Sequence, residues 1–218
     1  MSKIEHSIND DLKQLLQQAA ARHSHLCPRQ VLGVRIGLAG AAALGLPGPR
    51  RDKRLLVILE TDGCFADGVE TATGCTVGHR TLRVEDYGKI AATFIDVKTE
   101  QALRIIPRLD VRQRAAAYAP GETRRYFAQL AGYQVMPDEE LLAVQTVQLT
   151  RPAAEIVSRP GVRVNCATCG EEIVNEREVL VDGRPLCHAC AYGGYYATSI
   201  ALPVAQIQSA PRAEYDYA

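Results

Sequence analysis

The chain has 218 residues, of which 47% are hydrophobic and 23% charged, proportions typical of a globular protein rather than a disordered one. Lysine and arginine together number 25, as do aspartate and glutamate, so the formal net charge is zero and the basic excess of nucleic-acid-binding proteins is absent. No stretch reaches the about 18 uninterrupted apolar residues of a transmembrane helix, and the N-terminus lacks the apolar core of a signal peptide. We therefore expect a cytoplasmic protein that binds neither nucleic acid nor a membrane.

Two helices are predicted at the start of the chain. Apolar residues recur at helical spacing over residues 7–22, which indicates an amphipathic helix. Pro28 suits the first turn of a second helix, because its missing N–H would be unpaired there in any case. This helix extends to about Leu46, with apolar residues on nearly all sides, as in a buried helix. Three glycines, spaced three or four residues apart, should let another element approach it closely: Gly33, Gly37 and Gly40.

The remainder of the first 150 residues mixes short apolar segments with amphipathic ones. Strands are predicted at residues 55–60, 82–84, 90–97, 102–106 and 141–149, and helices at 65–73, 110–118 and 121–131. Because strands and helices do not alternate regularly, this order favours an α+β fold with a mixed sheet over a doubly wound one. We therefore expect four regions: an α+β core domain at 1–150, a linker at 151–161, a cysteine-rich module at 162–198 and a tail at 199–218.

Seven cysteines are many for a cytoplasmic chain, where structural disulfides are rare, so metal binding and reactive thiols are the leading interpretations. Four of them form two C-x2-C pairs, Cys166 with Cys169 and Cys187 with Cys190, separated by 17 residues. Each such turn directs two thiolates at one ion, and four thiolates complete the tetrahedron of a structural zinc site. Because so short a segment buries little core, the metal would supply most of its folding free energy. The alternatives are iron in the same tetrahedron, a redox pair, and four buried free thiols.

The segment between these pairs bears on what such a finger would contact. Residues 178–186 are predicted to form a hairpin with Asp182-Gly183 at its turn, and His188 is expected at the surface rather than on the metal. Residues 162–190 contain three arginines and five acidic residues. Zinc bound to four thiolates adds a further charge of about −2. Because this charge repels phosphate, we expect a finger that stabilises the protein or contacts a protein partner.

The connector between the first two predicted helices concentrates metal-ligating side chains. In an extended connector His23, His25 and Cys27 would face one side, and Cys27 would stand at a helix start, where the helix dipole favours the thiolate. The spacing alone supports two interpretations equally: a metal or catalytic site, and a set of residues with ordinary structural roles. Further candidates follow the strand at 55–60 or lie in the glycine-rich turn beyond it: Cys64, Asp67 and Cys75.

These segments resemble the E-subunit family of formylmethanofuran dehydrogenase. The likeness rests on the motifs HSHLCP (23–28), ETDGCFAD (60–67), TGCTVG (73–78) and DYGK (86–89), together with Gly33, in the family's order and spacing. It extends over about residues 10–150. The C-terminal cysteines are similar to the four-cysteine fingers of the TraR/DksA kind.

This resemblance implies a compact α+β core related in fold to the C-terminal domain of glyceraldehyde-3-phosphate dehydrogenase. It also implies a homodimer, with a cleft lined by the histidine–cysteine segment and the strand-end cysteine. On this sequence, the family's site corresponds to His25, Cys27 and Cys64. Further cofactor-binding candidates are His23, Asp67 and Cys75.

Together these features predict a metal-binding accessory protein with structural zinc in the finger. A second transition metal, or a metal-containing cofactor, would bind in the core at His25, Cys27 and Cys64, since thiolate and imidazole suit zinc, iron, nickel or copper. An alternative is a thiol enzyme, with Cys27 as nucleophile or redox thiol, His25 as its base and Cys64 as resolving thiol. A second alternative is an interaction module whose finger contacts a protein partner.

Overall fold

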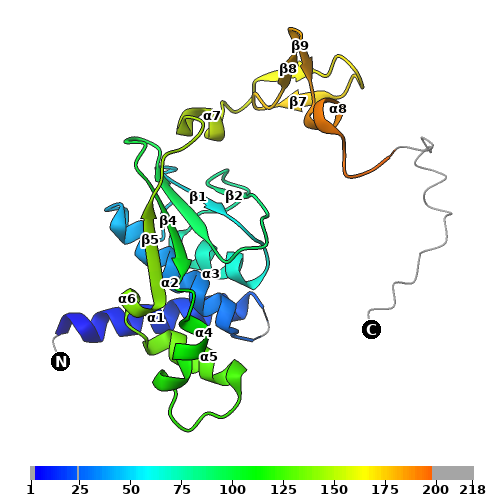
Figure 1. Ribbon diagram of the computed structural model, residues 1–218. Coiled ribbons are helices and arrows are strands. Elements are labelled where there is room, and N and C mark those ends of the chain that lie inside the picture. Colours follow the sequence, from blue (N-terminus) through cyan, green and yellow to red (C-terminus); the bar gives the residue numbers. More distant parts are fainter. Residues whose placement is uncertain (1–2, 24, 198–218) are drawn as a thin grey trace. The chain divides into compact units, whose positions relative to one another are not determined.

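The computed structural model describes residues 3–23 and 25–197, with side chains from residue 11 onward. The chain divides into two compact units, Met1–Val157 and Ser158–Ala218, and each is described here by itself (Figure 1). The tail predicted at 199–218 lies outside the described residues. No helix in the described part of the chain combines the length and apolarity needed to span a membrane.

The first unit is built on a mixed sheet of five strands, which confirms the α+β prediction. Strand β1 pairs in parallel with β2, whereas the other neighbours are antiparallel. The order is β2-β1-β3-β4-β5, with β1 at Leu55–Leu59, β2 at Leu82–Val84, β3 at Ala92–Asp96, β4 at Ala102–Pro107 and β5 at Leu142–Thr146.

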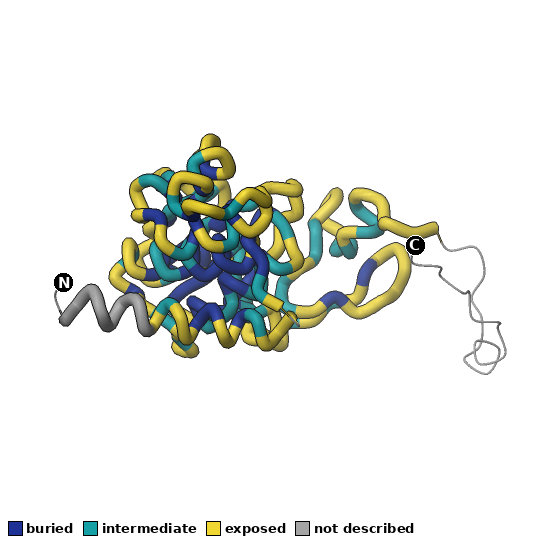
Figure 2. Tube along the Cα trace, turned by 90° about the horizontal axis from the view of Figure 1, so that it is seen from below, coloured by how far each residue is buried: buried dark blue, intermediate teal, exposed yellow. Residues whose placement is uncertain are grey.

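Helices cover one face of this sheet and enclose the main core. The long ones are α1 (Lys3–Ala21), α2 (Pro28–Ala43), α3 (Cys64–Thr73) and α5 (Arg125–Val135). Side chains alternate along β1, so that Leu55, Val57 and Leu59 pack under the helices whereas Leu56 belongs to a second cluster. That second cluster includes Ala153. Because β1 is buried on both faces, its sequence is a continuous apolar run. Figure 2 shows buried residues gathered inside the unit.

Several short helices differ from the predicted elements. Helix α7 (Ala153–Val157) falls inside the segment predicted as a linker at 151–161, and the division between the two units, after Val157, also falls within that segment. Its start is fixed by a hydrogen bond from the Ala153 N–H to Glu100 Oε1 (3.2 Å), and its apolar residues pack on the sheet. The expected helix at 110–118 is a turn of α-helix, α4 (Val111–Arg114), followed by a 3-10 turn at Ala115–Tyr118.

Helix α6 (Asp138–Leu141), which the sequence pattern did not predict, is held by an arginine on α2. Arg35 donates to the carbonyl oxygens of Tyr133 (2.8 Å) and Met136 (2.7 Å) and to Asp138 Oδ1 (2.6 Å). The same guanidinium therefore satisfies the end of α5 and the start of α6. Such a contact joins residues about a hundred positions apart, so local periodicity does not reveal it.

The expected close approach to the glycines of α2 is confirmed. A Cβ built on Gly33 would lie 2.3 Å from the Phe65 carbonyl oxygen, and one on Gly37 would lie 2.7 Å from Ala72 Cβ, both on α3. A Cβ on Gly40 would lie 2.3 Å from the Phe94 ring of β3. The later glycine on α2, Gly37, meets a later residue on α3 than Gly33 does, so the two helices run in the same direction. Their N-terminal ends consequently lie side by side.

The second unit contains two small hairpins and a short helix. Strands β6 (Arg163–Asn165) and β7 (Glu172–Val174) form one pair, and β8 (Val179–Val181) and β9 (Arg184–Leu186) form the other. The predicted turn at Asp182-Gly183 is confirmed, with φ values of 49° and 75° that suit a tight hairpin turn. Helix α8 (His188–Tyr192) follows.

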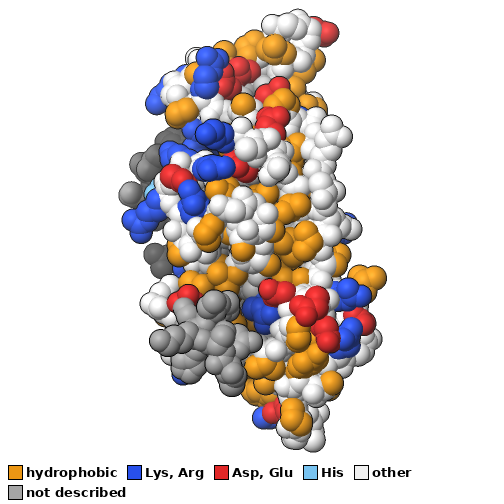
Figure 3. Space-filling view, turned by 90° about the vertical axis from the view of Figure 1, so that its left-hand side faces the viewer, with side chains coloured by type: hydrophobic (Ala, Val, Ile, Leu, Met, Phe, Trp, Pro, Cys, Tyr) orange, Lys and Arg blue, Asp and Glu red, His pale blue; other side chains and the backbone are white. Residues whose placement is uncertain are grey.

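Charged side chains of both signs are interspersed on the face drawn in Figure 3. Two acidic residues of the first unit, Glu60 and Asp96, are instead buried. Asp96 is 1% exposed, and its carboxylate accepts hydrogen bonds from Arg54 Nε (3.0 Å), Arg54 Nη2 (2.7 Å) and the Lys98 N–H (3.0 Å). The Arg54 guanidinium, and then the Lys98 N–H, hold the pKa of Asp96 well below its usual range.

Replacing Asp96 by asparagine should lower the free energy of unfolding at pH 7 by about 2 kcal/mol, because a buried charge-assisted network loses its acceptor. Since the folded-state pKa is depressed, the carboxylate's contribution is complete above its unfolded pKa of about 4 and is lost as the pH falls below it. Urea unfolding should therefore show a smaller difference between Asp96→Asn and wild type at pH 3 than at pH 7.

The control is Asp52→Asn, whose side chain is 48% exposed and pairs with Arg50 at the surface. It should leave the urea midpoint nearly unchanged at both pH values. An equal loss for Asp96→Asn at pH 3 and pH 7 would show that the ionised carboxylate is not what stabilises this corner of the sheet.

Candidate functional site

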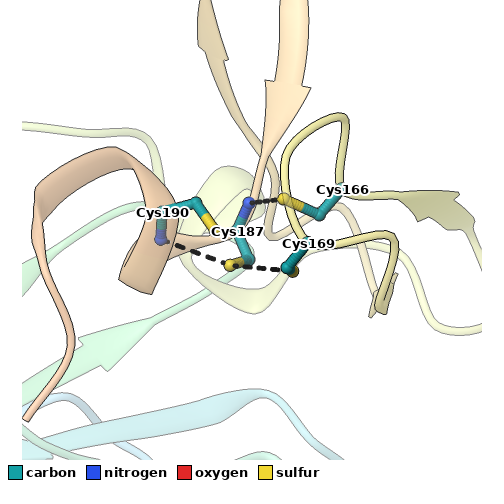
Figure 4. Close-up of side chains that lie close together, drawn as sticks. All are labelled: Cys166, Cys169, Cys187 and Cys190. Atoms are coloured by element: carbon teal, nitrogen blue, oxygen red, sulfur yellow. Dashed lines mark hydrogen bonds between the residues drawn. The ribbon is translucent and has the colours of Figure 1, made fainter. Parts of the chain in front are cut away.

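Four cysteine thiols meet in the C-terminal unit, as predicted from the two C-x2-C pairs. Cys166 and Cys169 come from the turn after β6, whereas Cys187 caps α8 and Cys190 lies on it. Figure 4 shows the four side chains converging, and their sulfur atoms all lie within 4.8 Å of one another. Sulfur atoms bound to one tetrahedral zinc ion at about 2.3 Å are about 3.8 Å apart. The Cys169–Cys187 sulfur separation of 3.9 Å fits that geometry.

Backbone donors prepare this cluster for a cation. The Cys187 N–H donates to Cys166 Sγ (3.3 Å), and the Cys190 N–H donates to Cys187 Sγ (3.4 Å). Backbone N–H groups, that of Cys169 first and then that of Cys187, lower the pKa of Cys166 to about 6. Contact with Cys187, and then burial, raises the pKa of Cys190 to about 12. Zinc deprotonates the thiols that bind it, so four thiols at this spacing suit such an ion.

A second thiol cluster forms in the first unit, where the N-terminal ends of α2 and α3 lie together. Cys27 is the N-cap of α2, and Cys64 is the first residue of α3. Gly33 and Gly68 permit this approach, because a Cβ on either would overlap the backbone of the other helix. Both thiols therefore lie at the N-terminal ends of helices that pack against each other.

A histidine and a carboxylate complete this second cluster. His23 Nε2 lies 3.3 Å from Cys64 Sγ, and His23 Nδ1 lies 3.3 Å from Asp67 Oδ2. The three side chains thus form a row from carboxylate to imidazole to thiol. Asp67 lies on α3 one turn after Cys64, so the helix itself places the carboxylate and the thiol at the two sides of the imidazole.

The electrostatic environment of the thiols is set by burial and by each other. Burial, and then contact with Cys27, raises the pKa of Cys64. The pKa of Tyr126, at the start of α5, is also raised, first by burial and then by the charges of Cys27 and Cys64. This tyrosine therefore lies within electrostatic range of both thiols. No sequence pattern pointed to it, because no local motif links a residue on α5 to thiols on α2 and α3.

The other predicted site residues are placed as follows. The ring of His25 lies 5.9 Å from that of His23 between centroids, and His23 Nε2 lies 3.3 Å from Cys64 Sγ. The connector is bent rather than extended, since the His23 N–H still bonds to the Ala20 carbonyl at the end of α1 (3.0 Å). Cys75 is 1% exposed, its thiol donates to the Leu55 carbonyl (3.4 Å), and burial raises its pKa.

The two clusters differ in how closely their possible ligand atoms approach one another. Among the side chains that the structure describes, the four finger cysteines are the one group of at least three His, Cys, Asp or Glu ligand atoms close enough together to hold an ion. The core cluster brings two thiols and one imidazole to the same place in a looser arrangement. Thiol and imidazole are the side-chain types that both borderline-soft metal sites and thiol enzymes use.

Comparison with known proteins places these features in a family. The model of the family described as FmdE, Molybdenum formylmethanofuran dehydrogenase operon, matches residues 22–153. A solved structure, that of a tungsten formylmethanofuran dehydrogenase FmdE-like protein from Syntrophus aciditrophicus, shares the fold with a TM-score of 0.53. It is 22% identical, and the match covers 85% of this chain and 95% of that one.

One curated relative is a probable S-adenosyl-L-methionine-binding protein from Archaeoglobus fulgidus. It is 28% identical over 209 residues, and the match covers 85% of this chain and 54% of the relative. The chain therefore spans about half the length of that relative. The family match, in contrast, covers more than half of this chain and includes the whole core cluster from His23 to Tyr126. From this match, and from the motifs that carry the cluster, the chain belongs to the FmdE family.

Proposed function

We propose that this protein is a metal-binding accessory protein with two metal sites of different purpose. Structural zinc binds the four finger cysteines. A transition metal, or a cofactor that contains one, binds at the core cluster through Cys27, Cys64 and His23. His25 is a further ligand within reach of a small movement of the bent connector, because its ring neighbours that of His23.

The proposal of a core metal site rests on one observation, the row formed by Asp67, His23 and Cys64. Histidines that bind metals usually donate their other ring N–H to a carboxylate, which fixes the tautomer and orients the ring. Asp67 is placed to do this for His23, leaving Nε2 directed at the thiol.

A metal bound here would supply Lewis acidity and a coordination position beyond those filled by the protein. The chain's own residues then orient and enclose the ligand. Asp67 holds the imidazole, the two helix N-termini carry the thiolates, and Tyr126 lies within electrostatic range of both. Two thiolates and an imidazole favour zinc, iron, nickel or copper over magnesium or calcium.

Metal content per chain of anaerobically purified protein tests this proposal. We expect one zinc equivalent in the finger and a second metal equivalent that Cys64→Ser abolishes. Asp67→Asn should weaken the second site by about 10- to 100-fold, because it removes the carboxylate that orients His23. The matched control is Cys75→Ala, which removes a core thiol that lies apart from the cluster and should retain both equivalents. A single equivalent in wild type, bound to the finger alone, would refute the core site.

A thiol enzyme is the second candidate, and the same row of side chains favours it. Carboxylate, imidazole and thiol in sequence form the arrangement of an activated nucleophile, with its base and the group that orients the base. Because His23 Nε2 lies 3.3 Å from Cys64 Sγ, this candidate takes Cys64 as the nucleophile and Cys27 as the resolving thiol, the reverse of the roles expected from the sequence. Rapid iodoacetamide labelling of Cys64 at neutral pH, with or without a chelator, would support the enzyme. Protection that ends only on chelation would support the metal site.

The name of the Archaeoglobus fulgidus relative suggests a ligand to test first. We propose S-adenosyl-L-methionine as a ligand of the core cluster, since the match to that relative covers 85% of this chain. Calorimetric titration of the metal-loaded protein should give saturable binding that Cys64→Ser weakens. Absence of binding heat at ligand concentrations up to the millimolar range would remove this ligand.

Three further properties complete the proposal. We propose that the core shares the fold of the C-terminal domain of glyceraldehyde-3-phosphate dehydrogenase, that the protein is a cytoplasmic homodimer, and that the finger contacts a protein partner. The finger carries exposed apolar side chains suited to such a contact, among them Leu180 and Tyr192. Light scattering of the purified protein would test the dimer, and a monomeric mass at micromolar concentration would refute it.

A further inference from the structure

One buried polar side chain links the elements that carry the core cluster. Gln30, on the first turn of α2, is fully buried. Its Oε1 accepts a hydrogen bond from the Cys27 N–H (2.9 Å), and its Nε2 donates one to the Ala19 carbonyl near the end of α1 (2.8 Å). A buried amide is costly unless it is hydrogen-bonded, so these two bonds fix the side chain in one arrangement.

The two bonds close the connector that carries both histidines. Ala19 precedes the connector and Cys27 ends it, so the Gln30 amide joins its two ends. Cys27 and Gln30 are also the N-cap and third residues of a capping box, which sets the direction in which the chain enters α2. With both ends pinned, the connector has few ways to place His23, and the observed one directs His23 at Cys64.

The same residue also contacts the helix that carries Cys64. A Cβ on Gly68 would lie 2.4 Å from the Gln30 carbonyl oxygen, so the backbone of α3 rests directly on this position. Gln30 is therefore in contact, through its side chain or its backbone, with all three segments whose residues form the cluster: α1 with its connector, α2 and α3.

We propose that Gln30 is a positioning residue of the core site, whose amide holds Cys27 and the histidine connector in the arrangement that meets Cys64. The inference rests on the proposed metal-binding function of that cluster. Gln30 touches no metal or ligand itself. It acts by holding the residues that do, as outer-shell partners of metal ligands generally do.

The test is a cobalt titration of full-length protein whose finger is filled with one equivalent of zinc. Cobalt bound by thiolates gives charge-transfer absorption, which reports both occupancy and ligand geometry. Wild type should take up a second equivalent, and Cys64→Ser should lose it, which assigns that equivalent to the core. Gln30→Met fills the same space without the amide, and it should weaken cobalt binding by about 10- to 100-fold and shift the absorption bands.

A matched control separates positioning from general loss of stability. Thr73 is also fully buried, and its hydroxyl also joins two backbone groups, donating to the Val69 carbonyl (2.7 Å) and accepting from the Cys75 N–H (3.2 Å). It lies at the end of α3 away from Cys64. Thr73→Val should therefore destabilise the fold without changing cobalt affinity or spectrum.

A second variant keeps the test informative if Gln30→Met does not fold. Gln30→Glu retains an acceptor for the Cys27 N–H, as in the usual capping box, but loses the N–H that Gln30 donates to the Ala19 carbonyl. It should therefore weaken cobalt binding by about 3- to 10-fold, the effect of one lost hydrogen bond. Unchanged binding in Gln30→Met, or equal weakening in Thr73→Val, would overturn the positioning role while leaving the metal site intact. Wild type that takes up no second equivalent would instead overturn the proposed function, and the positioning role with it.

Discussion

Removal of the metal from the finger is expected to unfold residues 162–197 while the core stays folded. Of the finger residues that the structure describes, Cys166 and Ile173 alone are buried, and α8 buries none of its residues. So small an apolar core does not offset the conformational entropy of ordering the segment, so the four metal–thiolate bonds must supply the difference. Cys187→Ser should have the same effect as a chelator, because it removes one metal ligand while the serine hydroxyl still serves as an N-cap of α8.

Hydrogen exchange followed by mass spectrometry measures this outcome region by region. Amides of β6 to α8 should exchange at the rate of an unfolded chain in Cys187→Ser, whereas those of β1, β3 and α2 should keep wild-type protection. The control is His188→Ala, which changes the residue beside that ligand; the His188 ring packs against Tyr192 (5.7 Å between centroids). It should retain one zinc per chain and full protection. Undiminished protection of the finger in Cys187→Ser would contradict a structural metal.

Replacement of Gly68 by alanine is expected to destabilise the core by about 3 kcal/mol, because the added methyl group has no space. Its Cβ would lie 2.4 Å from the Gln30 carbonyl oxygen, 2.8 Å from the Val34 nitrogen and 2.9 Å from Gly33 Cα. All three atoms belong to the backbone of α2, so no side chain can rotate to make room and α3 must move away as a whole. The gain in helix propensity from glycine to alanine, about 1 kcal/mol, is too small to compensate.

Gly78→Ala is the matched control, since a Cβ there meets no atom within 4 Å. Urea unfolding should place its free energy within about 0.5 kcal/mol of wild type. Because α3 carries Cys64 and Asp67, Gly68→Ala should also weaken the second metal equivalent while leaving finger zinc bound. A wild-type urea midpoint for Gly68→Ala would mean that α2 and α3 can separate without cost, and that this contact does not position the site.

Sequence patterns succeeded where one segment's own periodicity decided the outcome. Helix α2 begins at Pro28, as the preference of proline for a first helical turn predicts. The apolar run at 55–60 contains β1, as predicted, and the predicted close approach at the glycines of α2 is confirmed. The short helices α6 and α7 were missed, since each is held by partners distant in sequence, Arg35 for α6 and Glu100 for α7.

The sequence by itself determined the finger site, because two C-x2-C turns and a tight hairpin bring four thiols together over a short stretch of chain. It also limited the core site to one set of residues around two helix starts. The tertiary structure alone decided how they are arranged: His23 lies between Cys64 and Asp67, and Cys75 is buried elsewhere. The physical reason is that these contacts depend on how α2 packs on α3, and backbone contact at Gly33 and Gly68 joins segments about 35 residues apart.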